Sequence, residues 1–147
     1  MNYVAWALLG MIGYSLTTFF VKLATRDGQL SPFVVLVVAV TIVVTSAISI
    51  VIFNGDLARL SSENFRGAGI WYAVATGIVL AVAVSSLFKA LSMGPASVVV
   101  PVYGMFIVGG AILGIAFLGE PLTLRKIAGI ALAAVSIFLI AGDKAGK

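Results

Sequence analysis

Five stretches of this 147-residue chain are apolar for long enough to cross a lipid bilayer. The hydrocarbon core of a bilayer is about 30 Å thick, so a spanning helix needs about 20 apolar residues at roughly 1.5 Å each. A segment inside lipid must satisfy its backbone hydrogen bonds internally, which favours a helix even where Val and Ile are frequent. We therefore predict an all-α integral membrane protein, one membrane domain over residues 1–147, with helices at residues 3–24, 32–53, 68–91, 97–118 and 124–141.

The composition argues against a water-soluble fold. Apolar residues make up 62% of the chain and charged residues 10%, whereas soluble proteins need many polar groups to cover their surface. Cysteine and histidine are both absent, which removes disulfides, the commonest metal ligands and the usual near-neutral proton carrier. We expect no cofactor and no metal. The basic residues occur singly or in pairs between apolar runs, so we also expect no nucleic-acid partner.

Turn residues separate the predicted helices. Gly28 lies in the first turn, and Ser31 is the predicted N-cap of the second helix, with Pro32 at the first helical position, where its missing N–H has no cost. The turn at residues 94–95 is so short that the third and fourth helices are expected to form an antiparallel hairpin. The first stretch has no preceding basic residue and no small-x-small cleavage pattern, so we expect a retained helix rather than a signal peptide.

The basic residues divide almost evenly between the two sides of a five-helix arrangement. Four lie on the N-terminal side (Arg59, Arg66, Arg125 and Lys126) and five on the other (Lys22, Arg26, Lys89, Lys144 and Lys147). An excess of Lys and Arg normally marks the cytoplasmic side and sets the orientation. Two interpretations stay open. In the first, features other than the basic residues fix one orientation. In the second, the chain inserts both ways and assembles as an antiparallel homodimer, which forms an inverted repeat.

Three segments carry a resemblance to a known family. Residues 89–97 read KALSMGPAS, residues 117–123 read FLGEPLT and residues 129–140 read GIALAAVSIFLI. Together they strongly resemble the C-terminal half of an EamA domain of the drug/metabolite transporter superfamily, and residues 6–24 resemble its first helix. Typical members carry two such repeats and ten helices. The resemblance therefore implies a single-repeat transporter whose second half comes from a partner copy, in a prokaryotic cytoplasmic membrane.

The first helix is also distantly similar to that of the small multidrug resistance proteins, four-helix relatives that work as antiparallel dimers. When Lys22 is matched to the lysine near the end of their first helix, their membrane-embedded glutamate falls on Tyr14. A tyrosine, with an unperturbed pKa of about 10, cannot exchange protons in the pH range in which that glutamate does. No Asp or Glu lies inside the five stretches. We therefore expect weak pH dependence, and neutral, zwitterionic or anionic cargo rather than a cation.

Polar side chains within the apolar stretches mark a candidate substrate path. On the first helix Tyr14 and Thr18 are four residues apart and share a face, which Thr17 adjoins. Further candidates lie at both ends of the third helix and near the start of the fourth. The candidate substrate-binding residues are Tyr14, Thr17, Thr18, Tyr72, Thr76, Ser86, Lys89 and Tyr103. The alternative is structural, because hydroxyl groups in spanning helices also bond to carbonyls of their own helix.

For Tyr103 and Lys89, the assignment to a substrate site depends on the neighbouring structure. Pro101 cannot donate to the carbonyl of Ser97, so the fourth helix is expected to kink next to Tyr103, and broken helices often line transport sites. Proline is also commonly just tolerated in a spanning helix. Lys89 either reaches the headgroups or meets an anionic substrate group at a cavity mouth.

Small residues predict surfaces for close helix packing or dimer association. Gly110 and Gly114 on the fourth helix, and Gly129 and Ala133 on the fifth, form pairs of small residues four positions apart. In the turn between these helices, Glu120 is expected to have a structural role, in contact with the amides and the positive dipole end at the start of the fifth helix.

The sequence thus predicts a transporter that moves a small polar or amphipathic metabolite by alternating access in an antiparallel homodimer. One alternative is an accessory subunit that does not transport and pairs with another five-helix protein. The other is a membrane enzyme, for which Lys89 with Ser85 or Ser86 is the one arrangement available. Catalysis needs positioned acids, bases or nucleophiles, and the stretches offer only hydroxyls and two peripheral lysines. We therefore expect no enzymatic activity.

Overall fold

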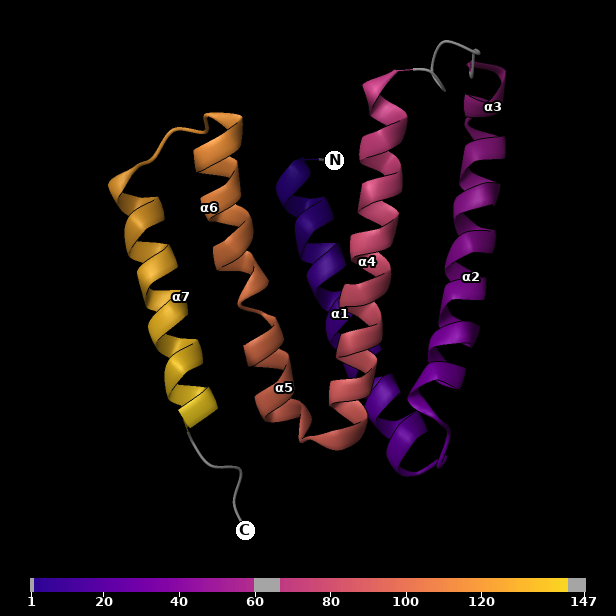
Figure 1. The fold of residues 1–147 in the computed structure, drawn as a ribbon, viewed down its shortest axis with the longest axis horizontal. Helices are drawn as coiled ribbons and strands as arrows, with labels where there is room; N and C mark the ends of the chain where they lie inside the picture. The colour runs from indigo at the N-terminus through magenta and orange to yellow at the C-terminus, as the bar shows by residue number, and fades with distance from the viewer. Residues whose placement is uncertain (1, 60–66, 143–147) are drawn as a thin grey trace. The chain divides into compact units, whose positions relative to one another are not determined.

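The computed structural model describes residues 2–59 and 67–142, and the regular elements in these ranges are all helices. They are α1 (Tyr3–Arg26), α2 (Pro32–Phe53), α3 (Asp56–Arg59), α4 (Ala68–Met93), α5 (Ala96–Tyr103), α6 (Phe106–Leu118) and α7 (Leu124–Gly142), as Figure 1 shows. The prediction of an all-α protein is confirmed. Three residues of the charge count, Arg66, Lys144 and Lys147, lie outside the described residues, as does the side chain of Arg59.

Four helical stretches of the described chain are long and apolar enough to cross a membrane. They are α1, α2, α4 and the 23 residues from Ala96 to Leu118, which comprise α5 and α6. Helix α7 is a further helix of 19 residues, so the fifth crossing stays a prediction. Large apolar side chains are exposed along all of these helices. Among the residues that the structure describes, the buried large apolar side chains are those of Val21, Leu87, Phe88 and Leu91. Such outward apolar surface needs lipid or a partner to cover it.

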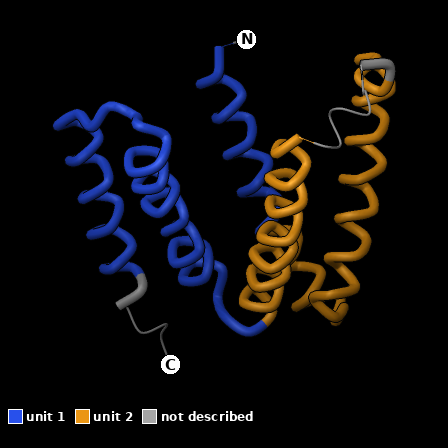
Figure 2. The backbone as a smooth tube through the Cα atoms, turned by 45° about the horizontal axis from the view of Figure 1, so that its top comes forward, with its two compact units in different colours: residues 1–18, 93–147 blue, residues 19–92 orange. Residues whose placement is uncertain are grey.

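The chain divides into two compact units, shown in blue and orange in Figure 2. The first unit consists of residues 1–18 and 93–147, and the second of residues 19–92. In the first unit, α7 turns back beside α5 and α6 and packs against both (Figure 1). In the second unit, the buried apolar residues come from the end of α1 and the end of α4, which a hydrogen bond from Lys22 to the Leu91 carbonyl joins.

The connection from α1 to α2 follows the predicted turn. The amides of Asp27 and Gly28 both bond to the carbonyl of Leu23, at 2.8 and 3.2 Å. Ser31 is the N-cap residue of α2, and Pro32 lies at its first position, but the Ser31 side chain makes no capping hydrogen bond. Instead, the Ser31 carbonyl accepts the amides of Val34 and Val35. The predicted position of the cap is confirmed, while its side-chain bond is absent.

Gly28 is required by this turn, which gives a testable prediction. A Cβ atom at position 28 would lie 2.8 Å from the carbonyl oxygen of Ala24, so Gly28→Ala should lower the free energy of unfolding by about 1–3 kcal/mol. Denaturant titration of the purified protein in detergent measures this. Gly77→Ala in α4 is the matched control, because a Cβ there meets nothing within 4 Å and alanine favours a helix. Equal losses for both variants would contradict the steric explanation.

The fourth predicted helix is interrupted. The range 97–118 was expected to be one kinked helix, but α5 ends at Tyr103 and α6 begins at Phe106. At the interruption the Met105 amide bonds to the Val102 carbonyl at 3.2 Å, three residues back rather than four, which is the tighter 3₁₀ pattern. Pro101 lies inside α5, where its missing N–H leaves the Ser97 carbonyl without that bond. The helix is then interrupted at Gly104 and Met105, after the end of α5 at Tyr103.

Candidate functional site

Two of the predicted site residues, Tyr14 and Tyr103, meet in the first unit. Their rings are nearly parallel, with an interplanar angle of 9° and centroids 6.5 Å apart, within the range of interacting aromatic pairs. The two hydroxyl oxygens are 3.5 Å apart, and either can donate. Tyr14 retains 44% exposure. The pair therefore presents an accessible surface with apolar ring faces and two hydroxyl groups.

The interruption after Pro101 positions the second half of this cluster. Tyr103 is the last residue of α5 and Phe106 the first of α6. Their rings meet edge to face, with centroids 5.7 Å apart and an angle of 62°. Tyr103 is thus held between Tyr14 and Phe106, and we call these three residues the aromatic cluster. Phe106 was not among the predicted site residues, because apolar content alone does not distinguish it from a lipid-facing phenylalanine.

The two threonines of α1 bond to their own helix. Thr17 Oγ1 donates to the Gly13 carbonyl at 2.9 Å, and Thr18 Oγ1 donates to the Ser15 carbonyl at 2.8 Å. Thr18 is 7% exposed, so its hydroxyl has little access to a ligand in this arrangement. These bonds are those of the structural alternative, in which hydroxyls satisfy helix carbonyls.

The remaining four predicted site residues lie along α4 in the second unit. Tyr72 is 74% exposed near the start of the helix, and Thr76 Oγ1 donates to its carbonyl at 2.7 Å. Ser86 Oγ donates to the Val82 carbonyl, also at 2.7 Å. Lys89 is exposed near the other end. These side chains occupy two separate ends of one helix, so they do not form a cluster among themselves.

A second ordered arrangement surrounds Glu120, in the turn between α6 and α7. Gly119 has a positive φ of 66°, a left-handed conformation that glycine adopts readily. The following amide, of Glu120, returns to the Gly114 carbonyl at 3.3 Å. This turn lays the carboxyl group over Gly114, where an added Cβ would be 3.3 Å from Glu120 Cδ. Gly114 therefore packs against a side chain of its own chain and is buried there.

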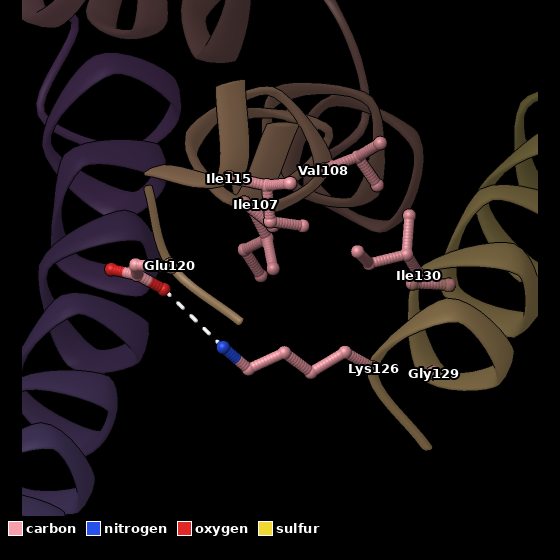
Figure 3. A pocket seen from close by; sticks show the side chains of 9 residues that line it. Ile107, Val108, Ile115, Glu120, Lys126, Gly129 and Ile130 are labelled. Atoms are coloured by element: carbon pink, nitrogen blue, oxygen red, sulfur yellow. Dashed lines mark hydrogen bonds and ion pairs between the residues drawn. The ribbon is translucent and has the colours of Figure 1, made fainter. Parts of the chain in front are cut away.

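The expected contact of Glu120 with the amides of the last helix was not found. Its carboxylate pairs instead with the ammonium of Lys126, at 3.4 Å (Figure 3). The Lys126 amide bonds to Thr123 Oγ1 at 3.2 Å, so the threonine performs the capping role. The carboxylate still reaches the first turn of α7, through a side chain rather than through the backbone.

An apolar groove of about 280 Å³ lies between α6 and α7, next to this ion pair (Figure 3). The lining on α6 includes Ile107, Ala111 and Ile115. On α7 it includes Gly129 and Ala133, the small-residue pair predicted for close packing. Gly110, by contrast, has nothing within 4 Å of an added Cβ and does not line the groove.

Lys22 has a role that the sequence did not reveal. Its Nζ atom donates to the Leu91 carbonyl at 2.9 Å, across 69 positions of sequence. Leu91 is in the last turn of α4, where carbonyls lack helical donors and a cation is favourable. Helical periodicity describes neighbours on one helix, so it could not identify an acceptor on another. Within the two described ranges, no three His, Cys, Asp or Glu residues are grouped to hold a metal ion.

Restoring a backbone donor at position 101 should alter the aromatic cluster. We expect Pro101→Ala to make α5 more regular and to shift the residues that follow it, because the alanine N–H can bond to the Ser97 carbonyl and the proline ring is gone. The rings of Tyr103 and Phe106 would then turn relative to Tyr14. The measurement is tyrosine fluorescence. The matched control is Pro121→Ala, which replaces a proline in the turn before α7 and should leave the tyrosine spectrum unchanged. An unchanged tyrosine spectrum in Pro101→Ala would contradict the link between the break and the cluster.

The long apolar helices, the interrupted stretch and the polar groups within them define a multi-pass membrane protein. The chain matches the EamA-like transporter family over residues 1–142. A relative from Sinorhizobium sp., described as an uncharacterized transporter in the cobO 3′ region, is 33% identical over 137 residues, which are 92% of this chain and 94% of the relative. No solved structure matches the chain significantly. The chain belongs to the EamA-like transporter family, and its length corresponds to one repeat.

Proposed function

We propose that two copies of this chain, inserted in opposite orientations, form a ten-helix transporter that moves a small polar or amphipathic metabolite by alternating access. In this proposal α7 is the fifth crossing, residues 1–147 form one membrane domain, and the membrane is the prokaryotic cytoplasmic membrane. Support comes from the single repeat and from the near-equal charge count of four and five on the two sides. Inverted repeats commonly hold their substrate near the midplane between two halves that rock against each other.

The aromatic cluster is the observation that carries the assignment of a site. Tyr14 lies halfway along the 24-residue α1, and Tyr103 ends α5 at the interruption of a spanning stretch. Interrupted helices at membrane depth are tolerated where they are buried in protein or line a cavity. In the proposal, ring faces pack on the apolar part of the cargo and the hydroxyls exchange hydrogen bonds with its polar part. Thr17, Thr18, Tyr72, Thr76, Ser86 and Lys89 remain secondary candidates.

A ligand screen followed by transport tests this function. Purified protein is heated with amino acids, nucleosides, sugars and organic anions, since a ligand that binds the folded state raises its melting temperature. Ligands that do so are then measured for uptake into proteoliposomes. We expect at least one small polar compound to satisfy both tests. A protein that neither dimerises nor transports when purified alone would be the accessory subunit instead.

The orientation requires its own experiment. A reporter fused to the C-terminus should appear on both faces of the membrane at normal expression, in roughly equal amounts, because the charge bias is so small. Adding two lysines to the C-terminal tail should shift the reporter towards the cytoplasmic face. A reporter found on one face only would exclude the antiparallel homodimer, while leaving the family assignment intact.

Transport should depend weakly on pH. The chain has no histidine or cysteine, so no side chain has an unperturbed pKa between about 5 and 8. Its five carboxyl residues, Asp27, Asp56, Glu63, Glu120 and Asp143, all lie outside the predicted spans; Glu63 and Asp143 fall outside the described residues. We expect the uptake rate to change less than about twofold from pH 6 to 8 for a non-titrating cargo. Steep uptake driven by a proton gradient would contradict this.

A further inference from the structure

The groove between α6 and α7 has one polar end and two apolar walls. Glu120 and Lys126 are at the polar end, where the two helices are connected. From Ile115 the α6 wall continues back to Ile107, eight residues or about 12 Å along the helix. Ile107 is 61% exposed, so the groove is open at its side. If α6 and α7 span the membrane, the ion pair lies near the headgroups and the groove continues towards the bilayer centre.

The dimensions of the groove favour a thin occupant. Its volume of about 280 Å³ is slightly below the range of roughly 300–1,000 Å³ typical of pockets for compact small molecules. Its walls are apolar, with polar atoms concentrated at the end near Glu120 and Lys126. A narrow apolar groove with charged residues at one end matches a hydrocarbon chain attached to a polar headgroup. Phospholipids surround a spanning helix with their chains already in this direction.

The two charges at the mouth indicate the kind of headgroup. The distance of 3.4 Å between Lys126 Nζ and Glu120 Oε2 is long for a charge-assisted bond, which is usually about 2.7–2.9 Å. Both side chains stay accessible, at 42% and 52% exposure. A headgroup with a phosphate and an ammonium could contact both, phosphate to Lys126 and ammonium to Glu120. An anionic headgroup without an ammonium could also contact Lys126 through its phosphate, but it would bring no cation to the Glu120 carboxylate and would place a second negative charge beside it.

We infer that this groove is a binding site for a zwitterionic phospholipid, with one acyl chain between α6 and α7 and the headgroup bridging Lys126 and Glu120. The inference concerns a lipid site separate from the aromatic cluster and does not depend on which metabolite is transported. The inference also assigns a role to Gly129 and Ala133, because these small residues leave space in the groove for the acyl chain. The glycine at position 119 keeps Glu120 folded over Gly114 at the mouth.

Lipid-dependent stability tests this inference. Protein stripped of lipid in detergent is heated with phosphatidylethanolamine, or with phosphatidylglycerol carrying the same acyl chains. We expect the first to raise the melting temperature by several degrees and the second to have a clearly smaller effect. Native mass spectrometry should show about tenfold weaker retention of phosphatidylethanolamine by Glu120→Gln and by Lys126→Gln. Equal effects of the two lipids, or unchanged retention by both variants, would overturn the assignment of the headgroup contacts.

A matched pair of variants tests the position of the chain. Ala111→Leu fills the groove and should remove the lipid-dependent rise in melting temperature, whereas Ala116→Leu, on the same helix but outside the groove, should preserve it. If Ala111→Leu disrupts the dimer and leaves the lipid effect unchanged, a second copy occupies the groove and the inference is wrong. If Ala111→Leu does not fold, the Glu120→Gln and Lys126→Gln retention measurements decide the question.

Discussion

Replacing Tyr14 with alanine should lower the initial rate of uptake by about 10- to 100-fold. The variant removes one ring of the aromatic cluster and the hydroxyl 3.5 Å from that of Tyr103, and small losses of substrate positioning have effects of this size. Tyr14→Phe should have a smaller effect, because the ring pair persists while one hydrogen-bonding group is lost. The measurement is uptake into proteoliposomes of the compound identified by the ligand screen.

The control for this prediction is another tyrosine on the same helix. Tyr3 is 83% exposed at the start of α1, so Tyr3→Ala changes the same side chain without touching the cluster and should leave uptake within about twofold of the unsubstituted protein. The melting temperature of each variant distinguishes lost transport from lost folding. Normal transport by a folded Tyr14→Ala protein would remove the aromatic cluster from the proposed site.

Hydropathy predicted much of the fold because a backbone in lipid has no water to bond to and must satisfy its hydrogen bonds within the segment. A stretch with no charge and no water must form its own hydrogen bonds, so α2 can be read directly from residues 32–53. Local chemistry predicted the N-cap position of Ser31 and a disturbance of the spanning stretch that contains Pro101. The extent of that disturbance could not be predicted. A proline removes one donor, but neighbouring residues decide whether the helix bends or divides, and here it divides at Gly104 and Met105.

The candidate site was harder to predict, because its residues come from different helices. Spacing on α1 grouped Tyr14 with Thr17 and Thr18, yet the structure pairs Tyr14 with Tyr103 and engages both threonines in bonds to their own helix. Periodicity assigns residues to a face but does not say which helix that face meets. Glu120 is similar, since its sequence position near α7 suggested the helix amides, whereas the backbone turn at Gly119 directs it to Gly114 and Lys126.

Lys22→Met should lower the free energy of unfolding by about 1.5–3 kcal/mol, the range for hydrogen bonds that involve a charged group. The Lys22 ammonium donates to the Leu91 carbonyl at 2.9 Å, in the last turn of a helix whose final carbonyls have no helical donor. The bond lies at the one place in the described chain where apolar side chains are well buried, with Leu91 at 0% and Val21 at 3% exposure. Methionine keeps the length and apolar stem of lysine but donates no hydrogen bond.

Lys89 provides the matched control for this prediction, because it is a lysine near the same end of α4 but is exposed. Lys89→Met should change the free energy of unfolding by less than about 0.5 kcal/mol, and Lys22→Arg should recover part of the loss by donating to the same carbonyl. Denaturant titration in detergent at two salt concentrations measures all three. A partly buried bond is screened less by salt than a surface charge, so the Lys22 effect should persist at high salt. Equal losses for the two methionine variants would instead mean that general headgroup or detergent contacts, rather than the bond to α4, account for the stabilisation.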